Sequence, residues 1–279
     1  MSLPLEHSKD HGIDRKYDDL RRILCDLDGV IVAFSGGVDS TFLLKAASDT
    51  LDKGKVVAVT ANSATLKPEE LERARKTAKD LGIVHIVLDT HEMDDPEYTN
   101  NTPDRCYYCK KIRFCGLDAV KKELGIEHIV DGANMSDAGD YRPGERAARE
   151  IGIRSPLREA SLYKDEIRAL SKSLGLPDWD MPSQACLASR FPYGTALTPE
   201  RLKQVYEAEK LIGDLGSRQA RVRYHGDMAR IEIPASDIER LVAYRESIVS
   251  HLKKLGFIYI TLDLQGFRSG SLNEVLDRR

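Results

Sequence analysis

The 279-residue sequence contains no long hydrophobic run. A membrane-spanning helix needs roughly 18 or more consecutive apolar residues, and no segment approaches that length. The N-terminal residues carry too many charges to form the apolar region of a secretory signal. We therefore expect a cytoplasmic protein that does not enter a membrane.

Cysteine is scarce, and basic residues are not in excess. Five cysteines in a chain of this kind argue against a disulfide framework and for metal or thiol chemistry. The net charge is −3, and from residue 185 onward Lys and Arg outnumber Asp and Glu only by 15 to 12. Neither part of the chain is basic enough to indicate nucleic-acid binding, so no nucleic-acid partner is expected.

Two common phosphate-binding motifs are missing, the Walker pattern and the dinucleotide-binding Gly-x-Gly-x-x-Gly. Instead, Ser-Gly-Gly-Val-Asp-Ser occupies residues 35–40, between the apolar run 30–34 and the helix-like segment 41–47. Two glycines at a helix start let the backbone approach a ligand, and the free N–H groups favour an anion. The pattern resembles the pyrophosphatase loop (PP-loop) of N-type ATP pyrophosphatases, which split ATP between its α and β phosphates. The alternative is a glycine turn in an ordinary βα unit.

Strand and helix patterns alternate through the first two thirds of the chain. We predict strands at 30–34, 56–60, 84–88 and 128–131, and helices at 13–27, 68–81, 107–124 and 163–174. This alternation predicts an α/β fold, a parallel sheet with helices on both faces and a ligand crevice at the carboxyl ends of the strands.

The last third of the chain has a different order. A helix at 199–215 precedes a hairpin formed by 220–224 and 229–233, a second helix at 236–255 and a strand at 259–264. This order predicts a small α+β domain. A chain of this length suits two cores, and the segment 176–198, which contains three prolines and Gly194, marks the boundary. We expect domains at residues 1–184 and 185–279.

Three cysteines are candidate metal ligands. Cys106 and Cys109 form a Cys-x-x-Cys at an expected helix start, where the helix dipole favours thiolates. The motif by itself fits a redox pair, half a zinc site or half an iron–sulfur site, and its place late in the fold favours a metal. Cys186 is the further candidate, whereas Cys115 and Cys25 are expected to be buried small hydrophobic residues.

The number of thiol ligands separates the possible metals. Structural zinc needs four closed ligands, so Cys115 or a histidine would have to join the three cysteines. A [4Fe–4S] cluster can be held by three cysteines with one iron left open. If Cys115 is not a ligand, the cluster is therefore favoured.

Three further runs make a family resemblance specific. They are Pro-Asp-Arg-Cys-Tyr-Tyr-Cys-Lys-Lys at 103–111, Asp-Gly-Ala-Asn-Met-Ser-Asp at 131–137 and Cys-Leu-Ala-Ser-Arg-Phe-Pro-Tyr-Gly at 186–194. Together with the loop at 35–40, they resemble the LarE family over nearly the whole chain. LarE proteins are ATP-dependent sulfur transferases that help build the nickel-pincer nucleotide cofactor of lactate racemase. The resemblance also implies the adenine nucleotide alpha hydrolase-like fold.

The resemblance implies a substrate and a reaction. The substrate is pyridinium-3,5-biscarboxylic acid mononucleotide, whose carboxylates are adenylated by ATP and converted to thiocarboxylates with sulfide or another sulfur donor. The residues implied to bind ATP and Mg²⁺ are Ser35, Gly36, Gly37, Asp39, Ser40, Gly132, Asn134 and Asp137, with Asp39 also catalytic. For Asn134 and Asp137 the alternative is an Asx-type turn that closes a strand.

The family implies two possible roles for Cys186. Some members sacrifice this cysteine, which gives up its sulfur and becomes dehydroalanine. Others pair it with a Cys-x-x-Cys and hold a [4Fe–4S] cluster. Because this chain has both elements, we predict that Cys106, Cys109 and Cys186 ligate a cluster and that Cys186 is catalytic without being consumed.

Three arginines complete the candidate site. Arg190 is assigned to the catalytic residues, and Arg221 and Arg223 alternate along one predicted strand, so both point to one face. Two guanidiniums on one face suit a phosphate or a carboxylate, and the resemblance assigns them to the phosphate of the substrate nucleotide. The alternative is a solvated strand face. Glu209 is either an acidic member of this site or a surface residue, and Trp179 is expected to pack in the core.

Other functions are weighed against this one. A tRNA thiolase also joins such a loop to a three-cysteine cluster, but it needs a nucleic-acid surface, and the negative net charge counts against one. A nucleotide-binding module with structural zinc is the non-enzymatic alternative. Amidating relatives such as GMP and NAD synthetases share the loop but have no need of the three cysteines. We expect a homo-oligomer.

Overall fold

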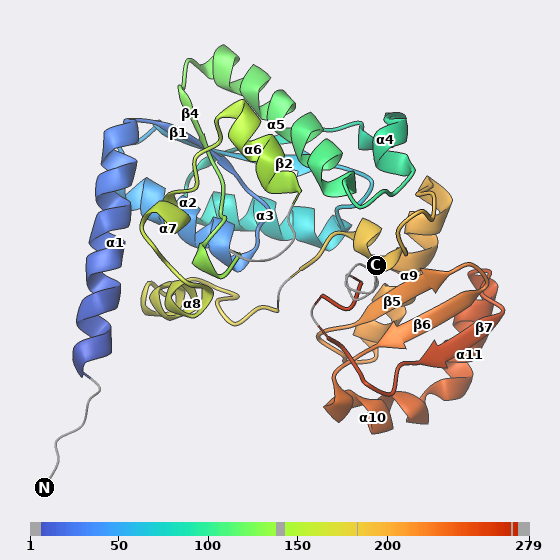
Figure 1. The fold of residues 1–279 in the computed structure, drawn as a ribbon. Coiled ribbons are helices and arrows are strands. Elements are labelled where there is room, and N and C mark those ends of the chain that lie inside the picture. The colour runs from blue at the N-terminus through green and yellow to red at the C-terminus, as the bar shows by residue number, and fades with distance from the viewer. Residues whose placement is uncertain (1–6, 138–142, 183, 269, 273–279) are drawn as a thin grey trace, which may run out of the picture. The chain divides into compact units, whose positions relative to one another are not determined.

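The computed structural model describes residues 7–137, 143–182, 184–268 and 270–272. The chain divides into two compact units (Figure 1). The first runs to Ser63 and also contains Pro68–His91 and Cys106–Ser183; the second contains Ala64–Lys67, Glu92–Arg105 and the chain from Gln184 onward. Within the described ranges, no helix is both long enough and apolar enough to cross a membrane.

The first unit is built on a four-stranded sheet, which confirms the predicted α/β fold. Its strands are β1 (Val30–Ala33), β2 (Val56–Asn62), β3 (Val84–Asp89) and β4 (His128–Val130), in the order β3-β2-β1-β4. Every neighbouring pair is parallel. Because β2 and β4 flank β1, the chain changes direction across the sheet there, and the ends of β1 and β4 form a topological switch point. Open parallel sheets bind ligands at such points.

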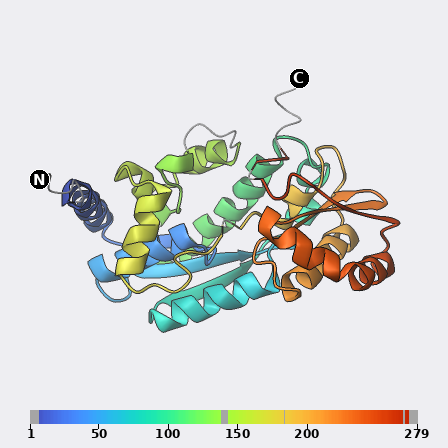
Figure 2. The same cartoon turned by 90° about the horizontal axis from the view of Figure 1, so that it is seen from below.

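Helices cover both faces of this sheet (Figure 2). They are α1 (His7–Leu27), α2 (Val38–Thr50), α3 (Pro68–Asp80), α5 (Arg105–Leu124), α6 (Gly144–Ile151), α7 (Pro156–Glu159) and α8 (Lys164–Ser173). Successive strand residues point to opposite faces. Val30 and Val32 accordingly pack with Phe42 of α2, whereas Ile31 packs with Phe114 and the rest of the α5 side. The short helices α6 and α7 were not predicted.

The second unit contains a small three-stranded sheet with the order β5-β6-β7. The strands β5 (Arg221–His225) and β6 (Met228–Glu232) form the predicted antiparallel hairpin, and β7 (Tyr259–Leu262) runs parallel to β6. The helices are α9 (Pro199–Asp214), α10 (Ile238–Ala243) and α11 (Arg245–Lys254), with short 3-10 turns η3 (Leu187–Arg190) and η4 (Ala235–Asp237). The single helix expected over 236–255 is wrong, because it is interrupted at Tyr244.

Two segments from earlier in the chain complete the second unit. One carries η1 (Glu92–Asp94) and α4 (Pro96–Thr99), and the other is Ala64–Lys67. Asn101, fully buried, donates from its side chain to the Pro192 carbonyl over 2.8 Å, and Leu187 N donates to the Thr65 carbonyl over 3.3 Å. These bonds tie both segments to the chain that follows Cys186.

Candidate functional site

The loop at residues 35–40 is closed by its own two serines. The Ser35 and Ser40 hydroxyl oxygens lie 3.1 Å apart, and Gly37 N donates to Ser35 Oγ over 3.3 Å. Ser40 Oγ in turn donates to the Gly37 carbonyl over 3.1 Å. The loop therefore gathers two hydroxyls and the backbone N–H groups that begin α2 at the end of β1. Such a helix start favours a bound phosphate.

Two glycines allow the close packing of this loop. Gly36 has a φ of +70°, and a Cβ built there would lie 3.2 Å from Ala74 of α3. A Cβ on Gly132, which follows β4, would lie 3.1 Å from Ser40 N. The loops after β1 and β4 thus meet at the switch point, and the structure brings the predicted residues of both loops together.

We expect Gly36→Ala to weaken ATP binding by at least tenfold. The left-handed backbone costs a residue with a Cβ about 1–2 kcal/mol, and the added atom would press on Ala74. Gly54→Ala is the matched control, because Gly54 also has a positive φ, +94°, but has open space around its Cβ position. Equilibrium ATP titration measures the effect, and equal affinities for the two variants would contradict it.

Asn134 and Asp137 close a turn after β4. Asn134 Oδ1 accepts from Ser136 N over 2.9 Å, and Asp137 Oδ2 accepts from Asn134 N over 3.0 Å. The structure therefore contains the Asx-type turn that was weighed as the alternative for these side chains. Their role at the nucleotide stays a prediction.

Two cations beside the loop were not singled out from the sequence. Lys164, at the start of α8, lies with its Nζ 3.9 Å from Asp39 Oδ2, and its backbone N donates to Ser136 Oγ over 3.0 Å. Arg73 Nε of α3 donates to the Gly36 carbonyl over 3.3 Å. Basic groups here suit a polyphosphate, but no local pattern distinguishes them from the other charged residues of amphipathic helices.

The cysteine pair lies on the first turns of α5. Cys106 is exposed and Cys109 is half-buried, and Lys110 Nζ lies 3.7 Å from Asp131 Oδ2 at the end of β4. Cys186 is half-buried and directly precedes η3. Cys106 and Cys109 belong to the first unit and Cys186 to the second. Among the described residues, no three His, Cys, Asp or Glu side chains are gathered as a metal site.

The expectations for the other two cysteines and the tryptophan are wrong. Cys115 is exposed because α5 buries the stripe of Phe114, Leu117 and Val120, from which position 115 points away. Cys25 is likewise exposed, because α1 buries Leu20, Leu24 and Leu27 and not position 25. Trp179 is half-buried, with Lys172 Nζ 4.6 Å from its ring centroid, so it is not a core residue.

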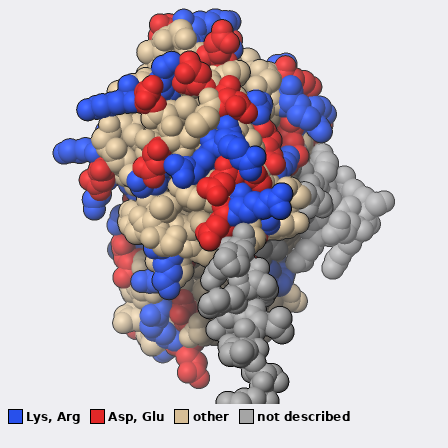
Figure 3. All heavy atoms as spheres, turned by 90° about the vertical axis from the view of Figure 1, so that its left-hand side faces the viewer, with Lys and Arg blue, Asp and Glu red and all other residues tan. Residues whose placement is uncertain are grey.

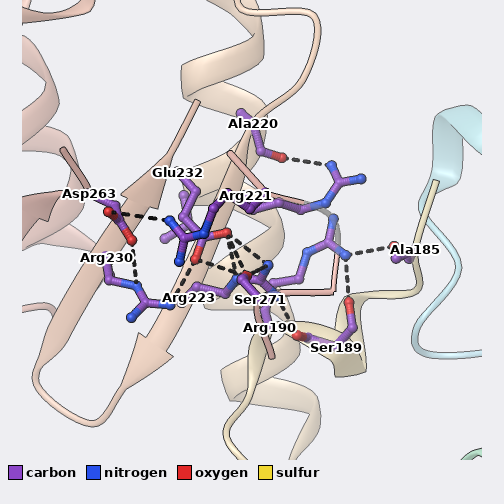
Figure 4. A network of polar contacts seen from close by, with 12 residues as sticks. Ala185, Ser189, Arg190, Ala220, Arg221, Arg223, Arg230, Glu232, Asp263 and Ser271 are labelled. Atoms are coloured by element: carbon purple, nitrogen blue, oxygen red, sulfur yellow. Dashed lines mark hydrogen bonds and ion pairs between the residues drawn. The ribbon is translucent and has the colours of Figure 1, made fainter. Parts of the chain in front are cut away.

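Arg190 belongs to a buried polar network in the second unit (Figure 4). Its side chain is fully buried, and its Nε and Nη2 donate to the two carboxylate oxygens of Glu209 over 2.7 and 3.0 Å. Its Nη1 donates to the carbonyls of Ala185 and Cys186 over 2.7 and 3.0 Å. Glu209 also accepts from Lys67 Nζ over 2.7 Å, so it is not a surface glutamate.

The pKa of Glu209 reflects these partners. Burial alone would raise the pKa, but the Arg190 guanidinium and the Lys67 ammonium outweigh it and lower the pKa from its ordinary value of 4.5 to about 2. The carboxylate is therefore charged across the physiological range.

Arg221 and Arg223 are buried, so the solvated strand face is wrong for them. Arg223 donates from Nε and Nη2 to Glu232 Oε2 over 3.0 and 2.8 Å, and from Nη1 to the Ser189 carbonyl over 2.7 Å. Arg221 Nη1 donates to the Ala220 carbonyl over 2.8 Å. In Figure 4, both side chains extend from β5 into the network that contains Arg190. Glu232 was not singled out from the sequence.

Comparisons with known proteins identify relatives of this chain. Residues 18–104 match the NAD synthase family. The chain is 43% identical to a pyridinium-3,5-bisthiocarboxylic acid mononucleotide synthase of Lactiplantibacillus plantarum, over 91% of this chain and 92% of that protein. It is 45% identical to an uncharacterized protein of Synechocystis, over 95% of this chain and all of that protein. A component of the glutamine-hydrolyzing GMP synthase of Pyrococcus abyssi is 25% identical over 95% of this chain and 88% of that protein.

Proposed function

Because the chain belongs to the LarE family, we propose that it is an ATP-dependent sulfur transferase acting on pyridinium-3,5-biscarboxylic acid mononucleotide. The observation that carries this proposal is the loop at 35–40, closed by its two serines at the start of α2. It occurs in a chain that is 43% identical to a synthase of the corresponding bisthiocarboxylic acid mononucleotide.

The first step is adenylation. A substrate carboxylate oxygen attacks the α-phosphorus of ATP, a new P–O bond forms, and the bond to the β-phosphate breaks to release pyrophosphate. Ser35, Ser40 and the N–H groups at the start of α2 bind the pyrophosphate as its charge develops. Lys164 and Arg73 add positive charge beside them. The mixed anhydride that forms makes AMP the leaving group for the second step.

Magnesium fits the oxygen donors at this loop. Mg²⁺ prefers carboxylate oxygens and retains several waters, and Asp39, in the first turn of α2, is the residue that would hold it. When bound, the ion neutralises charge on the departing pyrophosphate.

The second step exchanges oxygen for sulfur. A sulfur nucleophile attacks the adenylated carboxyl carbon, and the bond to AMP breaks. Arg221 and Arg223 would bind the phosphate of the mononucleotide, as buried guanidiniums on one strand can. Cys186 lies in the same unit as these arginines.

The three cysteines fit a [4Fe–4S] cluster by their chemistry. Cys106 and Cys109 are one turn apart on α5, neither is fully buried, and Cys186 adds a third thiol. Such a cluster, when bound, offers an open iron that can carry sulfide.

The charge pattern supports a small-molecule substrate over tRNA. A tRNA thiolase needs an extended basic surface. On the face shown in Figure 3, acidic and basic side chains are intermixed without an extended patch of one sign. The net charge of the chain is −3.

We expect pyrophosphate release that requires both ATP and the pyridinium mononucleotide, because the carboxylate is the nucleophile. A coupled pyrophosphate assay under anaerobic conditions measures it. Pyrophosphate release that needs no mononucleotide, or that depends on ammonia, would contradict the assignment and favour an amidating reaction.

A further inference from the structure

The backbone at Cys186 is held by a buried ion-pair network in the second unit. We propose that Arg190, Glu209 and Lys67 are positioning residues that fix Cys186 relative to the strand β5, which carries Arg221 and Arg223. This inference rests on the proposed function, which assigns sulfur chemistry to Cys186 and phosphate binding to β5.

The contacts of Arg190 show that it acts through its neighbours. A guanidinium has five N–H donors in a fixed fork. In Arg190 the fork reaches both oxygens of Glu209 on one side and the Ala185 and Cys186 carbonyls on the other. A third acceptor, Ser189 Oγ, lies 2.9 Å from Nη1. With no exposed surface and its donors engaged, Arg190 orients the Cys186 backbone.

Glu209 extends this connection to the phosphate-binding strand. Its Oε1 accepts from Val222 N over 3.0 Å, and Val222 lies between the two arginines of β5. Its Oε2 accepts from Lys67, which anchors the segment Ala64–Lys67. One carboxylate therefore joins the Cys186 carbonyl, through Arg190, to the backbone of β5.

A second connection joins β5 to η3, the turn that directly follows Cys186. Arg223 Nη1 donates to the Ser189 carbonyl over 2.7 Å, and its other nitrogens hold Glu232. Two independent links between η3 and β5 fix the distance and direction from the substrate phosphate to the Cys186 sulfur. Reacting groups misplaced by about 1 Å can lose roughly a hundredfold in rate, so this spacing matters for sulfur transfer.

Arg190→Lys tests the proposal. A lysine can keep the ion pair with Glu209 but cannot donate from a planar fork to the carboxylate and the carbonyls together. We expect sulfur transfer to fall roughly a hundredfold, with an unchanged KM for the mononucleotide. In the purified, reduced, iron-free protein, the rate at which iodoacetamide alkylates Cys186 should rise several-fold, while the rates at Cys25 and Cys115 stay as they are. Peptide mass spectrometry resolves the three sites.

Arg240→Lys is the matched control, because Arg240 is an exposed arginine that donates to the Gly216 carbonyl. It should match the wild type in every readout. Wild-type alkylation of Cys186 in Arg190→Lys would overturn the positioning role, whether or not the wild type transfers sulfur. A wild type that forms no thiocarboxylate would instead overturn the proposed function and leave the alkylation test standing. If Arg190→Lys does not fold, the same alkylation measurement is made on Lys67→Gln, which removes the ammonium that donates to Glu209. An unchanged rate of Cys186 alkylation in Lys67→Gln would overturn the proposal.

Discussion

Replacing Cys186 by alanine is expected to abolish thiocarboxylate formation while pyrophosphate release persists. The thiol is the group proposed to serve sulfur transfer, whereas the loop that splits ATP belongs to the first unit. The fold should survive, because Arg190 contacts the Cys186 carbonyl oxygen and not its side chain. Product mass spectrometry and a pyrophosphate assay on the same samples measure both steps. Cys115→Ala, at an exposed position of α5, is the control and should leave both steps unchanged.

The Cys106→Ala/Cys109→Ala double variant separates the two routes for sulfur. If the three cysteines hold a cluster, this variant loses its iron after anaerobic reconstitution and also loses sulfur transfer. If Cys186 is sacrificed instead, the variant still completes one turnover, and the Cys186 peptide then has the mass of dehydroalanine. That second result would contradict the cluster assignment while preserving the proposed reaction.

Glu209→Gln is expected to lower the free energy of unfolding by about 3 kcal/mol. The change leaves Arg190 and Lys67 without their carboxylate in a buried site, and breaking a buried pair by removing one partner typically costs about 3–5 kcal/mol. The melting temperature should fall by roughly 6–12 °C. Asp214→Asn on the same helix is the control, because its ion pair with Lys210 is exposed and should contribute little. A Glu209→Gln variant as stable as the control would show that the network does not hold the second unit together.

The ion pairs of Glu209 also make the stability of the protein depend on pH. The pKa of Glu209 is about 2 in the folded protein, below its ordinary value of 4.5. Because the pKa is lower in the folded protein than in the unfolded chain, the ionised carboxylate stabilises the fold fully at pH values above the unfolded-state pKa. This stabilisation is lost as pH falls from about 4.5 toward about 2. At about 1.4 kcal/mol per pKa unit, the difference corresponds to roughly 3 kcal/mol. Denaturant unfolding between neutral and acid pH should show this loss in the wild type and a smaller one in Glu209→Gln.

Strands β1 and β2 of the first sheet could be predicted because they are buried on both faces. Residues 30–32 and 56–59 are almost wholly buried, and they read as continuous apolar runs, as strands covered on both faces do. The loop between Ser35 and Ser40 could be singled out from the sequence as well, because its two serines bond to each other and to Gly37 within the loop. The apolar periodicity over 236–255 predicts one helix because it continues across the break at Tyr244.

The buried network could not be predicted in the same way. Lys67 and Glu209 are separated by 142 residues, and no periodicity relates them. Arg190 could be singled out from its motif, but its charge alone does not distinguish a group that touches substrate from one that holds Cys186. That distinction depends on the tertiary packing of η3, α9 and β5.

The most direct test of the proposed sulfur transfer is the mass of the mononucleotide product after anaerobic incubation with ATP and sulfide. We expect sulfur to replace oxygen in a carboxyl group, AMP to appear with it, and neither product to form without ATP. An unchanged mononucleotide, or one that carries an amide, would contradict the assignment.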